Sequence, residues 1–353
     1  MPTDEKNIRD FLENYQLRLE FYEDVGKVKK VYTQNGVFCI KSIPALKGTD
    51  FVKNIHTLYQ KGYNRIVPIF QTVNGQYGVL VGKQLWYLMP WLPNEIQGET
   101  LNRNKQMVRE LARMHVLSVH DKPVSKQERD AFYKQTKERW ERQKGFLDEY
   151  IGQVERKWYM SPFELQYSAY HEDMSRALSF SLDKFNEWYE ATKDDEKMRT
   201  VVTHGKLSTH HFVYSENGYG HFINLENAKE AAPHFDLLPF LVGQLRTYPR
   251  QPTDLLEMID LYLHHFPWRE GEKLLFMSYL SNPESSVNVV EDFFYKRGVG
   301  TARPEIEFCQ RLQTEYWLLK NTESMISTLE MNKQQAQMAA DNTGGTNAAM
   351  TGN

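Results

Sequence analysis

Over the first ninety residues, short apolar runs rich in β-branched and aromatic residues alternate with turn residues. The dipeptides Asn35-Gly36 and Asn74-Gly75 are strong hairpin signals between such runs. A helical pattern covers about 50–61, and Gly62 is placed to end it as a C-cap. The strands predicted in this way span 17–24, 28–33, 37–43, 67–73, 77–81 and 85–89, with 67–73 and 77–81 paired across Asn74-Gly75. The pattern predicts an antiparallel sheet accompanied by one helix.

From residue 100 onward the apolar spacing becomes helical. Amphipathic helices are predicted within 100–115, at least twice within 126–193, and over 254–266, 271–281, 287–296 and 305–330. Residues 332–353 contain no aromatic residue and little periodicity, which predicts a disordered tail. We therefore expect an α+β protein with a sheet-containing lobe over 1–92, a helical lobe over 93–331, and a hinge at Pro90 to Pro93.

Composition narrows the class of protein. The 353 residues are 41% hydrophobic and 25% charged, which is ordinary for a globular protein. A net charge of −3 gives no reason to expect a nucleic-acid partner. Two cysteines, Cys39 and Cys309, argue against a disulfide framework. The polar N-terminus and the absence of a run of about 18 apolar residues predict neither a signal peptide nor a membrane span.

The most informative stretch runs from 204 to 226. It reads His-Gly-Lys-Leu-Ser-Thr-His-His-Phe over 204–212 and Phe-Ile-Asn-Leu-Glu over 222–226. It resembles the catalytic loop and metal strand of aminoglycoside phosphotransferase and choline-kinase-type enzymes, which carry His-Gly-Asp-x-His-x-x-Asn and then Ile-Asp-x-Glu/Asp. The resemblance implies a two-lobed protein-kinase-like fold, and the strand and helix order of the N-terminal region agrees with it. It also aligns Lys206 with the catalytic Asp, His211 with the metal-binding Asn, and Asn224 with the metal-binding Asp.

These three replacements oppose phosphoryl transfer. Magnesium prefers carboxylate, phosphate and water oxygens, whereas Asn224 offers a neutral amide and His211 an imidazole. An ammonium group at Lys206 cannot accept the proton of an attacking hydroxyl at neutral pH. We therefore expect no catalytic residue, no metal site and no cofactor, and a pseudokinase rather than an enzyme.

Other positions of this chain keep the residue type of the family that it resembles. Lys41, on the strand after the Asn35-Gly36 hairpin, aligns with the phosphate-binding Lys, so Lys41 and Glu226 are the candidates for nucleotide binding. His204 and Asp236 align with structural residues of the loop, and Asp236 is expected to brace it by hydrogen bonds. The glycine-rich loop is reduced to Gly26. If Asn224 and Glu226 share one face of a strand, Lys206 should form an ion pair with Glu226.

The chain most resembles the spore coat kinase-like family, the group of the coat protein S and the YsxE-type coat protein of endospore-forming bacilli. The resemblance lies in Gly-Lys-Val-Lys-Lys-Val-Tyr at 26–32, in the loop at 202–212 and in a middle block containing Trp140, Trp158 and Trp188. It implies a structural or assembly role, other spore coat proteins as partners, synthesis in the mother-cell cytoplasm and deposition in the spore coat. Two alternatives stay open: a small-molecule kinase with an atypical site that uses ATP and magnesium, and a module that binds nucleotide without turnover.

Overall fold

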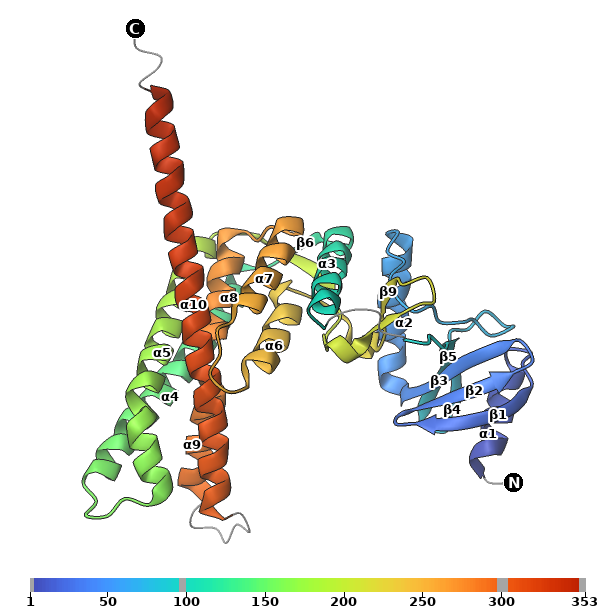
Figure 1. Cartoon of the computed structure of the whole chain (residues 1–353), viewed down its shortest axis with the longest axis horizontal. Helices are drawn as coiled ribbons and strands as arrows, with labels where there is room; N and C mark the ends of the chain where they lie inside the picture. The colour runs from blue at the N-terminus through green and yellow to red at the C-terminus, as the bar shows by residue number, and fades with distance from the viewer. Residues whose placement is uncertain (1–2, 95–99, 297–303, 349–353) are drawn as a thin grey trace. The chain divides into compact units, whose positions relative to one another are not determined.

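The computed structural model describes residues 3–94, 100–296 and 304–348 (Figure 1). The chain forms two compact units. The first contains residues 1–121, 199–237 and 261–267, and the second contains 122–198, 238–260 and 268–353. The first unit thus continues past the predicted lobe boundary at 92. The observed elements confirm the predicted α+β, kinase-like fold class, with an antiparallel N-terminal sheet and a mostly helical remainder.

The N-terminal sheet has five antiparallel strands in the order β1-β2-β3-β5-β4. Their bounds are Leu19–Val25 for β1, Val28–Thr33 for β2, Gly36–Pro44 for β3, Val79–Val81 for β4 and Gln84–Pro90 for β5. The first three strands and β5 lie close to their predicted ranges. Lys41 on β3 is directly opposite Tyr87 on β5, so these two side chains share one face of the sheet.

One predicted strand pair is wrong. No strand forms over 67–73 in the described structure, and β4 pairs with β5 instead. Pro68 lacks the amide hydrogen that a ladder requires. The neighbouring amide of Val67 donates to the carbonyl of Phe222 at 2.9 Å, outside the sheet. The Asn74-Gly75 signal still marks a turn, in which the Thr72 amide donates to the carbonyl of Gln76 at 2.8 Å.

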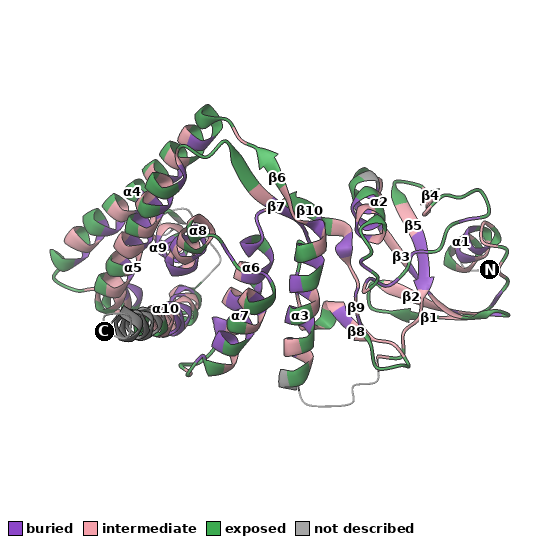
Figure 2. Cartoon of the chain, turned by 90° about the horizontal axis from the view of Figure 1, so that it is seen from above, coloured by how far each residue is buried: buried purple, intermediate pink, exposed green. Residues whose placement is uncertain are grey.

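Two helices cover the sheet. Helix α1 (Thr3–Glu13) buries Ile8, Phe11 and Leu12 against a cluster that includes Leu88 of β5. Helix α2 (Ala45–Gln60) begins about five residues before its predicted start and places the ring of Phe51 5.1 Å from the ring of Tyr87. Since Leu88 and Tyr87 are consecutive strand residues, the two helices pack on opposite faces. Figure 2 shows the buried residues concentrated in the middle of this sheet.

The helical remainder follows the predicted order. Its helices are α3 (Thr100–Ser118), α4 (Lys126–Glu155), α5 (Pro162–Thr192), α6 (His234–Leu245), α7 (Thr253–His265), α8 (Glu270–Ser281), α9 (Glu284–Lys296) and α10 (Glu305–Ala348). Serines cap the two long helices of the middle block: Ser125 begins α4 and Ser161 begins α5, each in a capping box. Trp140, Phe163 and Phe185 are fully buried in the core of the second unit.

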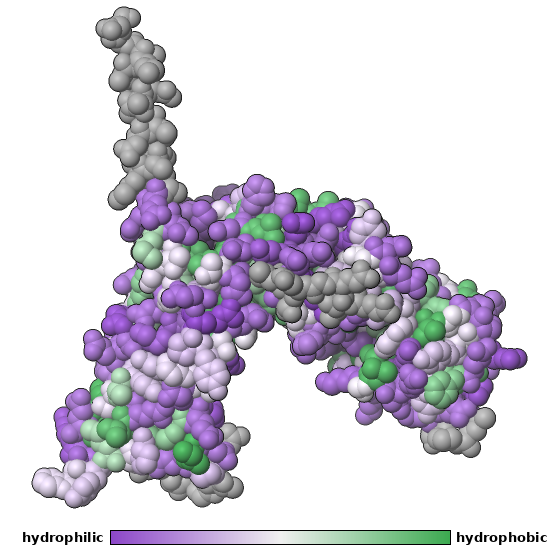
Figure 3. Space-filling view, viewed as in Figure 1, coloured by the Kyte–Doolittle hydropathy of each residue, from purple (hydrophilic) through white to green (hydrophobic). Residues whose placement is uncertain are grey.

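The expected disordered tail is also different in the structure. Helix α10 continues from Glu305 to Ala348, and the last five residues lie outside the described part of the chain. Residues 332–348 contain no proline, the residue that breaks a helix most strongly, although Gly344 and Gly345 carry the backbone-entropy cost of glycine. None of the described helices combines the length and apolar character needed to cross a membrane. The face drawn in Figure 3 is mostly hydrophilic with small hydrophobic areas.

Candidate functional site

The loop predicted to carry the chemistry lies in the first unit, after β7 (Lys197–Thr203). A 3-10 turn over Thr209–His211 leads into the hairpin of β8 (Phe212–Tyr214) and β9 (Gly220–Phe222). Gly205 has φ +76°, and a Cβ built there would lie 2.1 Å from the carbonyl oxygen of Asn227. Only glycine therefore fits between the loop and the segment after β9.

Asp236 holds this loop from the start of α6. Its carboxylate accepts hydrogen bonds from the backbone amides of His204 at 2.7 Å and Gly205 at 2.8 Å. It also lies 3.1 Å from Nε2 of His115, whose Nδ1 is 2.6 Å from the hydroxyl of Tyr262. An ionised carboxylate only accepts, so Nε2 donates to Asp236 and Nδ1 accepts from Tyr262. Burial would raise the pKa of Asp236, but the bonds from His115 and His204 outweigh it and lower that pKa.

Sequence reasoning placed His204 and Asp236 in the loop but missed Tyr262. His115 stood at the end of an apolar helical pattern, a signal that predicted the helix and not the contact. Tyr262 lies on α7, and its position along the chain gives no sign of a partner 147 residues earlier. The side chains of His115, His204 and Asp236 are all fully buried.

The segment from Asn224 to Glu226 is not the strand that was predicted. Strand β9 ends at Phe222, and Asn224 adopts a left-handed conformation with φ 65° and ψ 42° before a 3-10 turn over Leu225–Asn227. Asparagine tolerates this conformation better than most residues because its short side chain can hydrogen-bond locally. The turn, rather than strand alternation, brings Asn224 and Glu226 to a common partner.

That partner is Lys41. Its ammonium nitrogen forms an ion pair with Oε1 of Glu226 and a hydrogen bond with Oδ1 of Asn224. The hydroxyl of Tyr87 donates to the same carboxylate oxygen at 2.6 Å. The Lys41 and Glu226 side chains are only 13% and 9% exposed. The ammonium of Lys41, the carboxylate of Glu226 and the amide oxygen of Asn224 therefore satisfy one another on a mostly buried face of the sheet.

The surroundings set the protonation of this cluster. Burial would raise the pKa of the Glu226 carboxyl, but the ammonium of Lys41 and the hydrogen bonds from Lys41 and Tyr87 outweigh it, so that pKa lies below its usual value. Burial and the neighbouring carboxylate raise the pKa of Tyr87 well above its ordinary value. At neutral pH the Glu226 carboxyl is therefore ionised, and the neutral phenol of Tyr87 donates to it.

The expected ion pair between Lys206 and Glu226 is wrong. Glu226 forms its ion pair with Lys41. Within the described residues, Lys206 forms no ion pair. The cause is strand register: because Lys41 and Tyr87 are opposite each other on β3 and β5, both reach the carboxylate together. The backbone of Lys206 instead holds the two loop histidines. Its amide donates to Nδ1 of His204 at 3.3 Å, and its carbonyl accepts from Nδ1 of His211 at 2.8 Å.

The two loop histidines lie side by side. The rings of His204 and His211 are stacked, with centroids 5.7 Å apart and planes 11° apart. Nε2 of His204 donates to the carbonyl of Ile223 at 2.9 Å, which fixes its tautomer. Burial lowers the pKa of both histidines, so both are neutral at pH 7. His211 uses Nδ1 to bind the loop backbone, a structural contact at the position that aligns with a metal ligand.

The residues present do not fit a magnesium ion. Within the described residues, no group of three or more His, Cys, Asp or Glu side chains is arranged to hold a metal. The one carboxylate of the cluster, Glu226, is already neutralised by Lys41. The other two aligned positions supply an amide oxygen and an imidazole. A divalent cation here would lack the oxygen ligands it prefers and would meet the charge of Lys41.

Comparison with known proteins agrees with the kinase-like fold and with the motif of the loop. The model of the phosphotransferase enzyme family matches residues 30–274, more than half of the chain, and the chain belongs to that family. No curated protein matches it.

Two solved structures are similar in fold. An aminoglycoside phosphotransferase from Alicyclobacillus acidocaldarius subsp. acidocaldarius DSM 446 is 14% identical, with a TM-score of 0.70, and the match covers 92% of this chain and 96% of that one. Spectinomycin phosphotransferase APH(9)-Ia, solved with ADP and spectinomycin, is 12% identical, with a TM-score of 0.54 and coverage of 90% and 98%. At these identities the likeness establishes the shared fold.

We expect Gly205→Ala to destabilise the first unit by several kcal/mol, because the new methyl group must displace the Asn227 carbonyl and keep a positive φ. Gly218→Ala is the matched control, since Gly218 has φ +73° and no atom lies within 4 Å of the position that its Cβ would take. The free energy of unfolding of Gly218→Ala should fall only by the cost of a positive φ at a residue with a Cβ, about 1–2 kcal/mol. Urea unfolding of both variants measures the difference, and equal losses would contradict the close approach to Asn227.

We expect Glu226→Gln to lower the free energy of unfolding by about 3 kcal/mol at pH 7, because it leaves Lys41 buried without its counter-charge. The folded pKa of Glu226 is lowered, so its stabilisation is present above its unfolded pKa of about 4.3 and is lost as pH falls through the folded value. The deficit of the variant should therefore shrink below about pH 4. The exposed Glu216→Gln should change stability by less than about 0.5 kcal/mol at every pH. A pH-independent deficit would argue against the ion pair.

Proposed function

We propose that this chain is a non-catalytic member of the phosphotransferase family, a pseudokinase that keeps the fold for a structural or assembly role. One observation carries the proposal: Lys41 is bound to Glu226 and Asn224, the residues at the aligned nucleotide and metal positions. In an active relative a lysine of this kind would meet phosphate oxygens. Here its charge is neutralised from within the protein.

The charges near the loop also oppose catalysis. Phosphoryl transfer needs metal ions to neutralise developing negative charge and a residue that orients or deprotonates the nucleophile. Lys206 supplies a cation where the family motif has a base, and His211 uses its Nδ1 on the carbonyl of Lys206. Replacement of one residue could be compensated by a neighbour. Three replacements remove the aligned base and the two aligned metal ligands, and no group of three or more His, Cys, Asp or Glu side chains among the described residues is arranged to hold a metal.

The retained parts of the site are those that build the loop. Asp236 accepts from two consecutive loop amides and from His115, and all of these groups are buried. Such a network stabilises the fold whether or not a reaction takes place, because a buried amide without a partner is costly. The hydrogen-bond network of Asp236, together with the Lys41–Glu226 ion pair, supports a scaffold role.

The place that we propose for this scaffold is the coat of an endospore, with other coat proteins as partners and the mother-cell cytoplasm as the site of synthesis. This part rests on the sequence resemblance of the 26–32 and 202–212 segments to the spore coat kinase-like family. The binding of nucleotide without turnover and an atypical small-molecule kinase are the competing functions.

We expect the purified chain to show no change in melting temperature with ATP, either with or without magnesium, and no phosphorylation of amino-sugar or amino-alcohol acceptors. A double variant, Lys206→Asp with Asn224→Asp, should gain a magnesium-dependent rise in melting temperature because it restores two carboxylates. The matched control is Lys229→Asp with Asn227→Asp, which makes the same changes of residue type outside the aligned positions.

The outcomes separate the three functions. A rise in melting temperature of the unaltered chain with ATP, without turnover, would favour the nucleotide-binding module. Phosphorylation of an acceptor faster than about 0.1 per second, somewhat below the usual kinase range, would overturn the proposal.

For the location, we expect a fluorescent fusion of the chain in a sporulating bacillus to form a ring around the forespore and to co-extract with coat proteins from purified spores. The reason is that a scaffold without catalysis acts only where its partners assemble. A fusion carrying Gly205→Ala tests whether the loop is needed for this placement. Diffuse fluorescence of the unaltered, stably folded fusion throughout the mother cell would exclude the coat assignment and leave the non-catalytic assignment intact.

A further inference from the structure

The turn between α4 and α5 exposes two neighbouring aromatic side chains at one end of the second unit. Trp158 is 89% exposed and Tyr159 is 83% exposed, and the centroids of their rings lie 6.3 Å apart. Single exposed aromatic residues are common on protein surfaces, whereas two adjacent ones form a continuous apolar patch. Figure 1 shows this turn at the end of the α4–α5 hairpin, away from α6 and α7. We call these two side chains the aromatic tip.

Hydrogen bonds and an ion pair fix the turn that carries the aromatic tip. The amide of Ser161 donates to the carboxylate of Glu164 at 3.0 Å, and the ammonium of Lys157 pairs with the same carboxylate at 2.5 Å. The amide of Lys157 donates to the carbonyl of Val154 at 3.1 Å, which ties the turn to the last residues of α4. A surface that is ordered before binding loses little conformational entropy when a partner covers it.

Two opposite charges precede the aromatic tip. Glu155 and Arg156 are consecutive in the sequence, and both are exposed. Within the described residues neither of them forms an ion pair, whereas the next residue, Lys157, is held by Glu164. A carboxylate beside a guanidinium is complementary to itself: when two copies are related by a two-fold axis, each brings its Glu155 to the Arg156 of the other. The charges at the tip therefore favour a second copy of this chain as the partner.

The area of the tip predicts a weak association. A buried aromatic side chain removes about 150–250 Å² from water, so two rings from each of two copies bury about 600–1,000 Å² in total. That area is at the low end of specific interfaces. Leu165 and Ile306, which are 64% and 60% exposed, lie at the same end of the unit, where the amide of Phe163 donates to Glu305 at 2.9 Å. They add apolar surface around the tip.

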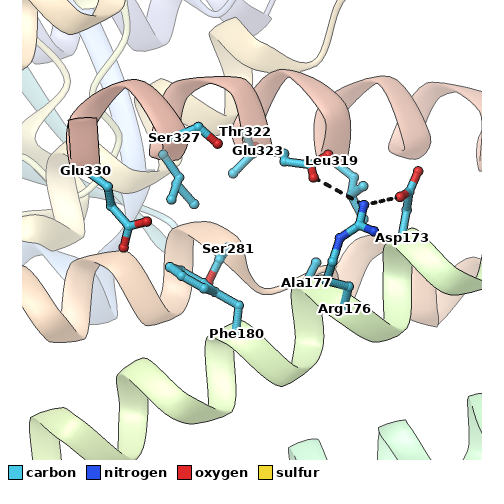
Figure 4. Close-up of a pocket in the computed structure, with 11 residues that line it drawn as sticks. Asp173, Arg176, Ala177, Phe180, Ser281, Leu319, Thr322, Glu323, Ser327 and Glu330 are labelled. Atoms are coloured by element: carbon cyan, nitrogen blue, oxygen red, sulfur yellow. Dashed lines mark hydrogen bonds and ion pairs between the residues drawn. The ribbon is translucent and has the colours of Figure 1, made fainter. Parts of the chain in front are cut away.

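A cavity of the second unit is the other surface that could receive the tip of a second copy, and such insertion would give open chains instead of a dimer. This cavity lies between α5, α8 and α10 and has a volume of about 230 Å³ (Figure 4). Arg176 in its wall pairs with Asp173 and, at 3.2 Å, with Glu323. Glu330 pairs with Lys184 at 3.8 Å. The charged residues of the lining are therefore already paired and leave the charges of the tip without a partner there.

We propose that the aromatic tip is the interface of a homodimer. Trp158 and Tyr159 of the two copies pack on one another about a two-fold axis, and Glu155 of each copy pairs with Arg156 of the other. The proposal does not depend on whether the loop of the first unit catalyses a reaction, because every residue that it uses belongs to the second unit.

The test is sedimentation velocity of the full chain over a series of concentrations. We expect a monomer–dimer equilibrium with a dissociation constant on the order of 10–100 μM and no larger species. Trp158→Ala and Tyr159→Ala should each raise this constant at least about tenfold, because exposed aromatic residues become the anchors of such an interface. Tyr248→Ala is the matched control: Tyr248 is 81% exposed in the same unit, and its loss should leave the equilibrium unchanged.

Charge reversal tests the two-fold arrangement itself. Arg156→Glu and Glu155→Arg should each weaken the dimer at least about fivefold, because each variant brings like charges together. An equimolar mixture of the two variants should associate as the unaltered chain does, since one copy then supplies two guanidinium groups and the other two carboxylates. Arg142→Glu, a reversal at an exposed position of α4, should have no effect.

The proposal is overturned if the unaltered chain stays monomeric well above the expected dissociation constant, or if the mixture of charge variants fails to recover association. Oligomers larger than a dimer would assign the tip to a head-to-tail contact instead. Co-sedimentation of a monomeric chain with vesicles of phosphatidylcholine and phosphatidylglycerol, lost in Trp158→Ala, would assign it to a lipid surface. If Trp158→Ala lowers the melting temperature, the charge variants decide, because they keep both rings.

Discussion

The Asp236 carboxylate is the constraint on which the loop region of the first unit depends. It is fully buried and accepts from two consecutive backbone amides and from His115, so the loop cannot move without leaving a buried charge unsatisfied. The close approach of Gly205 to Asn227 follows from the same arrangement, because it lets the loop lie directly against the segment after β9. The loop is thus held by buried hydrogen bonds to Asp236 from its own backbone amides and from His115.

Lys41 has its charge neutralised within the protein, by Glu226 and Asn224. A lysine on β3 next to Tyr87 would be a costly unpaired cation on a mostly buried face if no ligand were bound. The short turn after Asn224 delivers a carboxylate and an amide to it, so the pair is stable without phosphate. The left-handed backbone at Asn224 contributes to this pairing, since it starts the turn that brings Glu226 to β3 and β5.

The second unit is held together by a different interaction, the packing of aromatic side chains. Its core of aromatic residues, with the rings of Phe163 and Phe293 stacked at 4.0 Å, joins helices that lie far apart in the sequence. Beside this core, Oδ1 of Asn282 after α8 and the hydroxyl of Ser286 in α9 are buried and have no hydrogen-bond partner in the described structure.

The sequence alone determined the order of the elements, the class of fold and the frame of the loop, because hydrophobic periodicity, hairpin dipeptides and helix signals are local. It also identified the residues that fill the aligned positions, Lys206, His211 and Asn224. It misplaced the partner of β4, where Pro68 prevents the ladder, and it took Asn224 and Glu226 for a strand. Only the tertiary structure decided that Lys41, and not Lys206, neutralises Glu226, and that Tyr262 supports His115. These choices depend on strand register and on contacts such as that of Lys41 with Asn224, 183 positions apart, which no local pattern records.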